Sequence, residues 1–480
     1  MESVLKTIYS VIWGPALIYG ILLVGIMYTV LTRFVQVRLI KDSVKLMFAG
    51  EKSASGVSSF EALSMALSGR VGTGNIVGTA TAIAFGGPGA IFWMWATAFI
   101  GAATAFIEST LAQVYKEESQ GVYRGGPAYY IEKGTGQRWF GLIFAFTAIV
   151  ATSFLMTGVQ ANAISSATKN AFGIAPWVTG LALVVILGFI IFGGVRRIAR
   201  AATLIVPFMA IVYIAVALII IAMHITEVPA VFTLIISSAF GANSIFGGLV
   251  GSAIAWGVKR AIFSNEAGQG NGAHPAAAAE VSHPAKQGLV QSFSVYIDTI
   301  LVCSATAFMI LFMGTYNVQD GDENGAMVVE NLPGQSYSEY TQVAVDTAFS
   351  GLQGFGSAFV AVALFFFAFT TIMSYYYISE TNVAYIMGER DQRFGVWLVK
   401  IIVLVATFLG TVRTADMAWL VGDIGLGLMV WVNVIGMLIL TKPAIKVLKD
   451  YERQKREGKD PTFDPRPLGI KKADFWTKEK

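Results

Sequence analysis

The sequence predicts an all-α polytopic membrane protein with eleven transmembrane helices. Its 480 residues are 55% apolar and only 13% charged, whereas soluble domains carry about 25% charged residues. The mean hydropathy is +0.64. Apolar runs of about 20 residues, the length that crosses a hydrocarbon core of about 30 Å, recur along the chain. This composition excludes a soluble enzyme.

Eleven apolar stretches, each bounded by charged residues or turn formers, are predicted to span the bilayer. They are residues 12–31, 60–85, 90–115, 139–164, 178–192, 204–223, 245–271, 289–312, 355–378, 396–412 and 417–440. The first stretch lacks the small-residue cleavage site of a signal peptide, so it counts as a span.

Lysine and arginine predict the orientation, because both are retained on the cytoplasmic side. With the N-terminus outside, 27 of the 34 lysines and arginines fall in cytoplasmic loops or in a basic cytoplasmic tail over residues 442–480. Only Lys6, Lys169 and Arg413 fall outside. We therefore expect a multi-pass protein of the cell membrane (the plasma or inner membrane) with an external N-terminus and a cytoplasmic C-terminus.

The charge and the cysteine content limit which partners and metal clusters this chain can bind. The net charge of +4 comes mostly from the tail, and no basic stripe with interleaved aromatic residues indicates a nucleic-acid partner. The single cysteine, Cys303, allows neither an intrachain disulfide nor a thiolate metal cluster. The expected surroundings are the lipid bilayer and a small solute, and the sequence leaves the oligomeric state open.

Two spans contain glycine-interrupted stretches with the same Gly-x-Gly-Asn pattern. One lies at 72–75 in the second span and the other at 268–271 in the seventh. Since these spans are five crossings apart, the second copy is inverted relative to the first. Paired broken helices in inverted halves indicate a binding site near the bilayer midplane. Simple packing glycines are the alternative, and a break near Trp256 and Gly257 is the alternative placement in the seventh span.

Three segments resemble the alanine or glycine:cation symporter family. They are Arg70-Val71-Gly72-Thr73-Gly74-Asn75-Ile76, the run Gly86-Gly87-Pro88-Gly89-Ala90-Ile91-Phe92-Trp93-Met94-Trp95, and Lys259-Arg260 leading to Phe263-Ser264-Asn265-Glu266-Ala267-Gly268. The resemblance covers nearly the whole chain except the charged tail. It implies a sodium-driven importer of small neutral amino acids with a LeuT-like five-plus-five inverted repeat, preceded by one extra N-terminal helix.

This resemblance implies four parts. Residues 1–59 form the extra transmembrane helix and a cytoplasmic loop, 60–223 the first five-helix repeat, 224–441 the second, inverted repeat, and 442–480 the cytoplasmic tail.

A small zwitterion needs donors for its carboxylate and acceptors for its ammonium group. Peptide amides freed by the breaks and a positive half-helix end can hold the carboxylate, while carbonyl and amide oxygens can accept from the ammonium. Glycine also lets the backbone come close to the solute. The predicted substrate-binding residues are Gly72, Thr73, Gly74, Asn75, Gly268, Gln269, Gly270 and Asn271. The resemblance implies alanine or glycine as the substrate.

Sodium, the one cofactor ion expected, prefers oxygen ligands, which the adjacent hydroxyls of Thr370 and Thr371 offer. The LeuT-like arrangement implies that backbone oxygens of Ser68, Val71 and Phe367 complete the site. Ordinary bonding of threonine hydroxyls to their own helix is the alternative.

Arg70 is a charge within the second span, where it costs about 2.5 to 3.5 kcal/mol unless it is paired. We expect Glu266 as its first partner, then Asp298, then Glu108, in a network that is either structural or a gate. The resemblance places Arg70 where a first sodium site of this fold would take a backbone oxygen. Because a guanidinium repels a cation there, we predict one sodium ion per turnover.

Other polar residues have less specific interpretations. Gln160 and Asn162 in the fourth span face the solute or make interhelical hydrogen bonds. His274, Glu280 and His283 are expected in a helical cytoplasmic arm rather than in a metal site.

The sequence also bears on four other functions: a proton-coupled carrier, a passive channel, an enzyme and a nucleotide-driven transporter. A proton-coupled carrier is the nearest alternative, because Glu266 or Asp298 can titrate if it is unpaired. Nothing indicates the rings of charge of a passive channel. The spans contain no catalytic triad or metal-ligand spacing, and the chain has no nucleotide-binding loop. We therefore predict a secondary transporter and not an enzyme.

Overall fold

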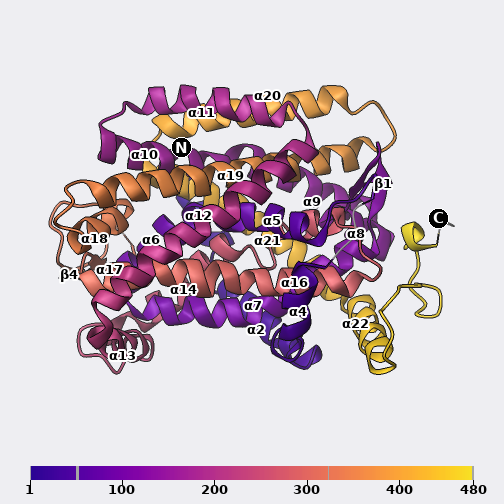
Figure 1. Ribbon diagram of the computed structural model, residues 1–480, viewed down its shortest axis with the longest axis horizontal. Coiled ribbons are helices and arrows are strands. Elements are labelled where there is room, and N and C mark those ends of the chain that lie inside the picture. Colours follow the sequence, from indigo (N-terminus) through magenta and orange to yellow (C-terminus); the bar gives the residue numbers. More distant parts are fainter. Residues whose placement is uncertain (1, 50–52, 323, 478–480) are drawn as a thin grey trace.

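The computed structural model describes residues 2–49, 53–322 and 324–477. Residue 1 and the parts of the expected N-terminal loop and basic tail at 50–52 and 478–480 lie outside the described residues. Long helices run roughly along the longest axis of the molecule (Figure 1). The helices α13 and α18 and the strand β4 lie at the left end in this view, and α22, β1 and the C-terminus lie at the right end.

The N-terminal part contains the first interrupted helix. Its elements are α1 (Glu2–Ile12), α2 (Pro15–Leu31), α3 (Val35–Arg38), α4 (Ile40–Met47), α5 (Ser59–Arg70), the π-helix η1 (Gly74–Gly78) and α6 (Thr79–Gly86). A capping box begins α5, because the Ser58 side chain accepts from the Glu61 amide while the Glu61 carboxylate accepts from the Ser58 amide at 2.9 Å.

The next part connects the two interrupted helices. It comprises α7 (Gly89–Val114), the antiparallel strands β1 (Glu117–Ser119) and β2 (Val122–Arg124), α8 (Pro127–Thr135), α9 (Arg138–Val150), η2 (Ala151–Leu155), α10 (Met156–Phe172), α11 (Pro176–Ile191), α12 (Val195–Met223), η3 (Ile225–Glu227), α13 (Val228–Ala239) and η4 (Gly247–Leu249). Side chains such as Phe189 on α11 and Leu204 on α12 are exposed, as expected of residues that face lipid.

The C-terminal part starts with the second interrupted helix. Its elements are α14 (Val250–Asn265), α15 (Ala273–Ala278), α16 (Pro284–Val295), η5 (Tyr296–Cys303), α17 (Ser304–Met313), the antiparallel strands β3 (Asn317–Gln319) and β4 (Met327–Glu330), η6 (Tyr337–Glu339), α18 (Tyr340–Ala348), α19 (Phe355–Met387), α20 (Arg393–Val412), α21 (Ala415–Ile439), α22 (Thr441–Arg456) and η7 (Asp474–Trp476).

Eight helices in the described part of the chain are long and apolar enough to cross a membrane. They begin at Glu2, Gly89, Arg138, Arg196, Pro284, Phe355, Arg393 and Ala415. The other three predicted spans are helical but shorter: α11 has 16 residues, and the second and seventh spans are divided by their glycine-rich stretches. The protein is a mostly helical polytopic membrane protein.

The break in the seventh span lies where the Gly-x-Gly-Asn pattern predicts it. The helix α14 runs without interruption through Trp256 and Gly257 and ends at Asn265. The alternative placement near Trp256 is therefore wrong. The helices α13 and α18 and the two short hairpins were not predicted, because loop-length segments of this kind carry no 20-residue apolar signal.

Candidate substrate and ion site

Both glycine-rich stretches interrupt their helices in the interior of the protein. The first leaves the α-helix after Arg70 and resumes as a π-helix at Gly74. The second follows Asn265 and contains positive φ angles at Gly268 (85°) and Gly270 (91°), which glycine adopts without steric cost. All eight predicted substrate-binding residues are buried.

The two breaks contact each other's helices. A Cβ added at Gly74 would lie 3.0 Å from the Cα of Ser264, so glycine is what lets η1 approach the end of α14. In the opposite direction, Arg70 reaches the backbone of Gly272, and a carboxylate oxygen of Glu266 lies 3.0 Å from where a Cβ of Gly69 would stand. Each break therefore sends one charged side chain across to the other.

Side chains satisfy the amides that the breaks leave free. The Gly72 amide donates to Asn75 Oδ1 at 2.8 Å, and the Thr73 amide donates to Gln160 Oε1 at 3.0 Å. In the second break, the amides of Gly268 and Gly270 each donate to Glu108 Oε2 at 3.2 Å. Irregular backbone at membrane depth needs such partners, and these are acceptors that an anionic ligand group can replace.

Three buried acceptors in the breaks have no hydrogen-bond partner among the described residues. They are the Thr73 hydroxyl oxygen and the amide oxygens of Gln269 and Asn271. Because buried polar atoms are nearly always paired, unpaired ones in both breaks indicate a place for a polar ligand.

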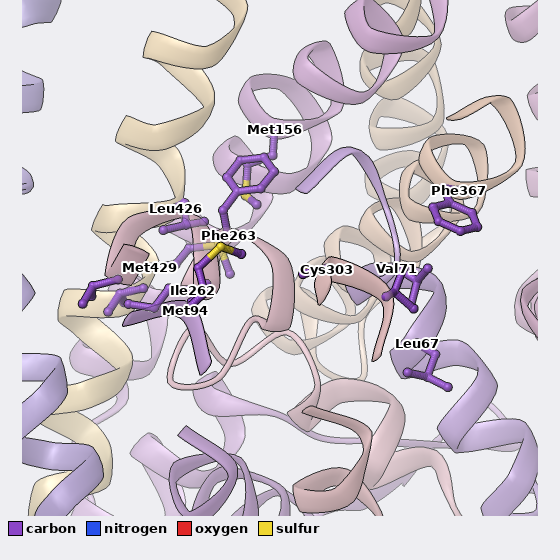
Figure 2. Close-up of a cluster of buried hydrophobic side chains, with 14 of the residues drawn as sticks. Leu67, Val71, Met94, Met156, Ile262, Phe263, Cys303, Phe367, Leu426 and Met429 are labelled. Atoms are coloured by element: carbon purple, nitrogen blue, oxygen red, sulfur yellow. The ribbon is translucent and has the colours of Figure 1, made fainter. Parts of the chain in front are cut away.

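An apolar wall stands beside the second break. The Gln269 amide nitrogen lies 3.3 Å from the Met156 sulfur and 3.9 Å from the Met429 sulfur. Figure 2 shows these methionines grouped with Phe263 and Leu426. Large apolar side chains therefore line this side of the second break.

Arg70 is completely enclosed but does not form the expected ion pair. Its Nη1 donates to the Gln291 carbonyl at 3.2 Å and to the Ser294 hydroxyl. The carboxylates of Glu266, Glu108 and Asp298 act on it electrostatically, but none of the three forms an ion pair with it within 4.0 Å. The expected acids therefore act on Arg70 from nearby, without a direct ion pair to any of them.

Each of the three acids accepts hydrogen bonds from other partners, Glu108 from the Gly268 and Gly270 amides given above. The Glu266 carboxylate accepts from Asn271 Nδ2 at 2.6 Å, so it is bonded to its own break while one of its oxygens lies against Gly69 of the other. The Asp298 carboxylate accepts from Asn75 Nδ2 at 2.6 Å, from the Ser264 hydroxyl at 2.9 Å and from the Thr299 hydroxyl at 2.7 Å. Asp298 thus links both interrupted helices to η5.

The predicted threonine pair lies against the first break. Both hydroxyls are 3.0 Å from the Phe367 carbonyl, and Thr371 Oγ1 is also 3.5 Å from the Gly69 carbonyl. Gly72 packs directly on the Thr371 hydroxyl. The Ser68 hydroxyl turns to the Met65 carbonyl at 2.7 Å. Thr370 and Thr371 therefore bond within their own helix, and Thr371 also contacts the first break.

His274 does not lie in a cytoplasmic arm, so that expectation is wrong. It is fully buried in α15, which folds back into the interior because its alanines are small enough to pack against other helices. Asn382 Nδ2 donates to His274 Nε2 at 2.9 Å, so the proton sits on Nδ1 and is donated to the Gly270 carbonyl at 2.9 Å. His274 thus supports the second break.

The other two residues of that expected arm are separated from His274. His283 caps α16 and lies 3.4 Å from Asp450, while Glu280 accepts from the Tyr123 hydroxyl at 2.7 Å. In the part of the chain that the structure describes, no group of three or more histidines, cysteines or acids could hold a metal ion.

Sequence reasoning missed Asn433 and left Gln160 open. Asn433 Nδ2 donates to Glu108 Oε2 at 3.1 Å and to the Gly268 carbonyl at 2.9 Å. Its signal was an amide in a span whose one charged residue is Asp423. Gln160 binds the first break, whereas Asn162 donates to the Gly410 and Arg413 carbonyls, as its interhelical alternative predicted.

Comparisons with known proteins identify the family. A model of the sodium:alanine symporter family matches residues 1–465. YrbD of Bacillus subtilis (strain 168) is 62% identical over 480 residues, which cover 100% of this chain and 98% of YrbD. The sodium/proton-dependent alanine carrier protein of Bacillus sp. (strain PS3) is 54% identical over 437 residues, 90% of this chain and 96% of that protein.

A solved structure shares the fold. The substrate-bound, outward-open structure of a Na⁺-coupled sialic acid symporter aligns with a TM-score of 0.53 at 11% identity, covering 98% of this chain and 96% of that one. The family match spans nearly all of the sequence, and its members are symporters rather than enzymes. The chain therefore belongs to the sodium:alanine symporter family.

Proposed function

We propose that this protein is a sodium-coupled symporter that imports small neutral amino acids, alanine and glycine among them, by alternating access. The observation that carries the proposal is the meeting of two interrupted helices. Their buried acceptors Thr73 Oγ1, Gln269 Oε1 and Asn271 Oδ1 lack partners in the part of the chain that the structure describes. Family membership and the name of the PS3 relative, an alanine carrier, support the substrate class.

The substrate carboxylate binds the amides of the first break. At Gly72, Thr73 and Gly74 it replaces side-chain acceptors such as Asn75 Oδ1. The ammonium group binds the free amide oxygens of Gln269 and Asn271 in the second break, where Gly268 and Gly270 keep the backbone close. The methionine wall restricts the ligand to a small side chain.

Sodium binds between the first break and α19. Its ligands are the hydroxyls of Thr370 and Thr371 with backbone oxygens of Ser68, Val71 and Phe367. An all-oxygen set suits this hard cation, and the 3.5 Å approach of Thr371 Oγ1 to the Gly69 carbonyl supports the placement. Because Arg70 occupies the neighbouring position, one sodium ion accompanies each substrate; a measured ratio of two would contradict this.

Arg70, Glu266, Asp298 and Glu108 form the charge network of the transport cycle. The Arg70 side chain lies against the second break and the Glu266 side chain against the first. Glu108 accepts from the Gly268 amide of the second break, and Asp298 accepts from Asn75 of the first. Intramembrane charges of this kind commonly mark solute pathways.

The proposed architecture has eleven spans in a LeuT-like five-plus-five inverted repeat after one extra N-terminal helix. Residues 60–223 form the first repeat and 224–441 the second, flanked by 1–59 and the basic tail 442–480. The N-terminus is external and the C-terminus cytoplasmic in the plasma or inner membrane. The likeness to the sialic acid symporter over 98% of the chain supports this fold.

Proton coupling is the alternative. It is favoured by one observation: three buried carboxylates, those of Glu108, Glu266 and Asp298, act electrostatically on the single Arg70. The PS3 relative is also named as sodium/proton-dependent.

Uptake into proteoliposomes tests the proposal. Radiolabelled alanine and glycine should accumulate with an inward sodium gradient at fixed pH and should not accumulate without it. Gln269→Ala should abolish accumulation without changing the elution volume of the purified protein. Accumulation driven by a proton gradient in sodium-free buffer would favour the alternative, and no accumulation under either gradient would refute both.

A further inference from the structure

The beginning of α12 borders a cavity that lies outside the site described above. The cavity has a volume of about 340 Å³, within the range of about 300 to 1,000 Å³ that small-molecule sites occupy. Arg196, Ala199 and Arg200 of α12 line it, together with the loop of residues 53–57 before α5 and Tyr123 of β2. By the proposed orientation, this end of α12 is cytoplasmic.

Three arginines in the first two turns of α12 carry charge that no carboxylate neutralises. Arg196, Arg197 and Arg200 are exposed, and α12 contains no acidic residue. None of the three forms an ion pair within 4.0 Å among the residues that the structure describes. Arg196 Nη2 donates to the Ala54 carbonyl at 2.6 Å, and Arg197 Nη1 donates to the Phe189 carbonyl at 2.7 Å. Arg200 has no hydrogen-bond partner in the described part of the chain.

The lining of the cavity favours an anion. Among its described residues Glu61 is the one acid. The Glu61 carboxylate accepts from the Ser58 amide at 2.9 Å and from the Ser58 hydroxyl at 3.2 Å, because it belongs to the capping box of α5. Arg196 and Arg200 are four positions apart, so their Cβ atoms lie about 5 to 6 Å from each other on one helix face. The two guanidinium groups can therefore bind the same phosphate.

The face of α12 that carries these two arginines continues into the membrane as an apolar ridge. Leu204, Phe208 and Ile211 follow Arg200 at the three- and four-residue spacing of one helix face. Their exposed fractions are 77%, 66% and 67%. Since α12 is long and apolar enough to cross a membrane, this ridge meets lipid acyl chains.

Helix geometry places the arginines at the depth of a lipid phosphate. Arg200 and Ile211 are eleven residues apart, which corresponds to about 16 Å at about 1.5 Å per residue. One leaflet contributes about 15 Å, half of a hydrocarbon core of about 30 Å. When Ile211 lies at the midplane, Arg200 lies at the boundary of the core, and its long side chain reaches the headgroup region.

We propose that the beginning of α12 binds one anionic phospholipid, whose phosphate takes Arg196 and Arg200 and whose acyl chain lies along Leu204, Phe208 and Ile211. Guanidinium groups suit this ligand because they bind phosphate oxygens in a bidentate manner. A zwitterionic phospholipid carries its own cation beside the phosphate and gains less from two arginines. The inference goes beyond the proposed transport function and does not depend on it.

Counting bound lipid tests the inference. The full chain, purified in detergent, is titrated with phosphatidylglycerol, and native mass spectrometry counts the lipid molecules that each chain retains. The double variant Arg196→Gln and Arg200→Gln should retain one molecule fewer and bind at this place about thirtyfold more weakly. This factor follows from about 1 kcal/mol for each basic residue near an anionic headgroup, with tenfold for each 1.4 kcal/mol.

A matched control removes two arginines from the beginning of another span. Arg390→Gln combined with Arg393→Gln changes the net charge equally, and both side chains are exposed near the start of α20. Arg393 already pairs with Asp391 at 2.9 Å, so this variant should retain as many lipid molecules as the wild type. Equal loss in both double variants would mean a general attraction of basic residues to anionic lipid and would overturn the site.

Other ligands identify the chemistry. Phosphatidylcholine should not fill the place that phosphatidylglycerol takes, and an excess of inorganic phosphate should not displace phosphatidylglycerol. Binding of phosphatidylcholine with the same affinity would overturn the assignment to an anionic lipid. Displacement by inorganic phosphate would overturn the lipid itself and indicate a site for a free anion.

A single variant covers the case in which the double variant does not fold, because Arg196 also holds the Ala54 carbonyl. Arg200→Gln removes a side chain that has no hydrogen-bond partner among the described residues, and it should weaken lipid binding about fivefold. Arg200→Lys keeps the charge and should remain within about threefold of the wild type. An unchanged affinity in Arg200→Gln would overturn the proposal.

Photo-labelling in nanodiscs locates the acyl chain. Phosphatidylglycerol with a photoreactive group at the end of its acyl chain should label α12 near Ile211 in the wild type. The label there should fall at least fivefold in Arg200→Gln and stay unchanged in the Arg390→Gln and Arg393→Gln control. Equal labelling of α12 in Arg200→Gln and the wild type would contradict a lipid held by this arginine.

Discussion

Gly72 is the residue at which the first break meets α19. A methyl group there would collide with the Thr371 hydroxyl and come within 3.1 Å of Gln160 Oε1. We expect Gly72→Ala to lower stability by about 1 to 3 kcal/mol, the usual cost of overpacking a filled interior, and to abolish sodium-driven alanine uptake.

Gly20 on α2 is the matched control for that substitution. Nothing lies within 4 Å of a Cβ added there, so Gly20→Ala should keep wild-type uptake and gain up to about 1 kcal/mol in helix stability. Thermal unfolding in detergent and proteoliposome uptake give both readouts. Wild-type uptake by Gly72→Ala would show that the close contact has no role in transport.

Substitutions of Thr371 test whether its hydroxyl is a sodium ligand or only bonds within its own helix. Its hydroxyl touches the Phe367 and Gly69 carbonyls, and valine has nearly the same shape without that oxygen. Thr371→Val should raise the sodium concentration for half-maximal uptake at least tenfold, whereas Thr371→Ser should remain within about threefold of the wild type, since tenfold corresponds to about 1.4 kcal/mol. An unchanged sodium dependence in both variants would remove Thr371 from the site.

Residue identities in the breaks could be predicted, but the pairing among charged side chains could not. The Gly-x-Gly-Asn repeats mark positions where only glycine allows the observed φ angles at 268 and 270. Which acid would face Arg70 depended on side-chain direction. Asn271 holds Glu266 from only five residues away, whereas Asn433 holds Glu108 across 325 residues, which nothing in the local sequence indicates.

At the scale of elements, α22 is docked by a charged hydrogen-bond network at the end of the molecule where the C-terminus lies (Figure 1). Asp450 accepts from Arg453 at 2.5 Å and from Gln454 at 2.7 Å and lies 3.4 Å from His283. The hydrogen bond with His283, followed by those with Arg453 and Gln454, lowers the pKa of Asp450 from 3.8 to about 2.

This pKa shift predicts an acid-dependent contribution of Asp450 to stability. Because the folded pKa lies below the unfolded one, the contribution is fully present above pH about 4 and is lost as the pH falls towards about 2. Asp450→Asn should therefore unfold more readily than the wild type at pH 6. The two melting temperatures should converge between pH 4 and pH 2, and a constant difference across that window would contradict the assignment.

The long helices could be predicted from apolar runs. How many of them are long enough to cross a membrane as one helix depends on where they are interrupted. The second and seventh predicted spans each divide at the glycines that build the site, so neither contains an unbroken helix of 18 residues. The hairpins and α18 follow turn chemistry and packing over short distances. A mean hydropathy over 20 residues does not detect such short turns and helices.

At the scale of the whole molecule, the inverted orientation of the two motifs stays a prediction, since it rests on their spacing and on the parity of the crossings between them. The cavity between α1, α6, α14 and α21 was not predictable, since its lining comes from six segments that lie far apart in the sequence. Arg260 and Asp423 are 163 positions apart, so nothing in the local sequence indicates that they pair.

The number of ions moved per cycle is a property of the whole transporter. Alanine has no net charge, so cotransport with one sodium ion moves one charge per substrate. At zero current, a tenfold alanine gradient then balances about 59 mV, against about 30 mV if two charges move. Reversal potentials in proteoliposomes at symmetrical pH should show the larger value.

A pH gradient separates sodium from proton coupling in the same recording. With one sodium ion and no proton, a change of one pH unit on one side should leave the reversal potential unchanged. The matched measurement is Thr371→Ser, which keeps the hydroxyl and should return the same slope as the wild type. A slope near 30 mV with no pH effect would mean two sodium ions, and Arg70 would then not exclude a second cation; the same slope with a pH effect would mean that one of the buried carboxylates carries a proton across.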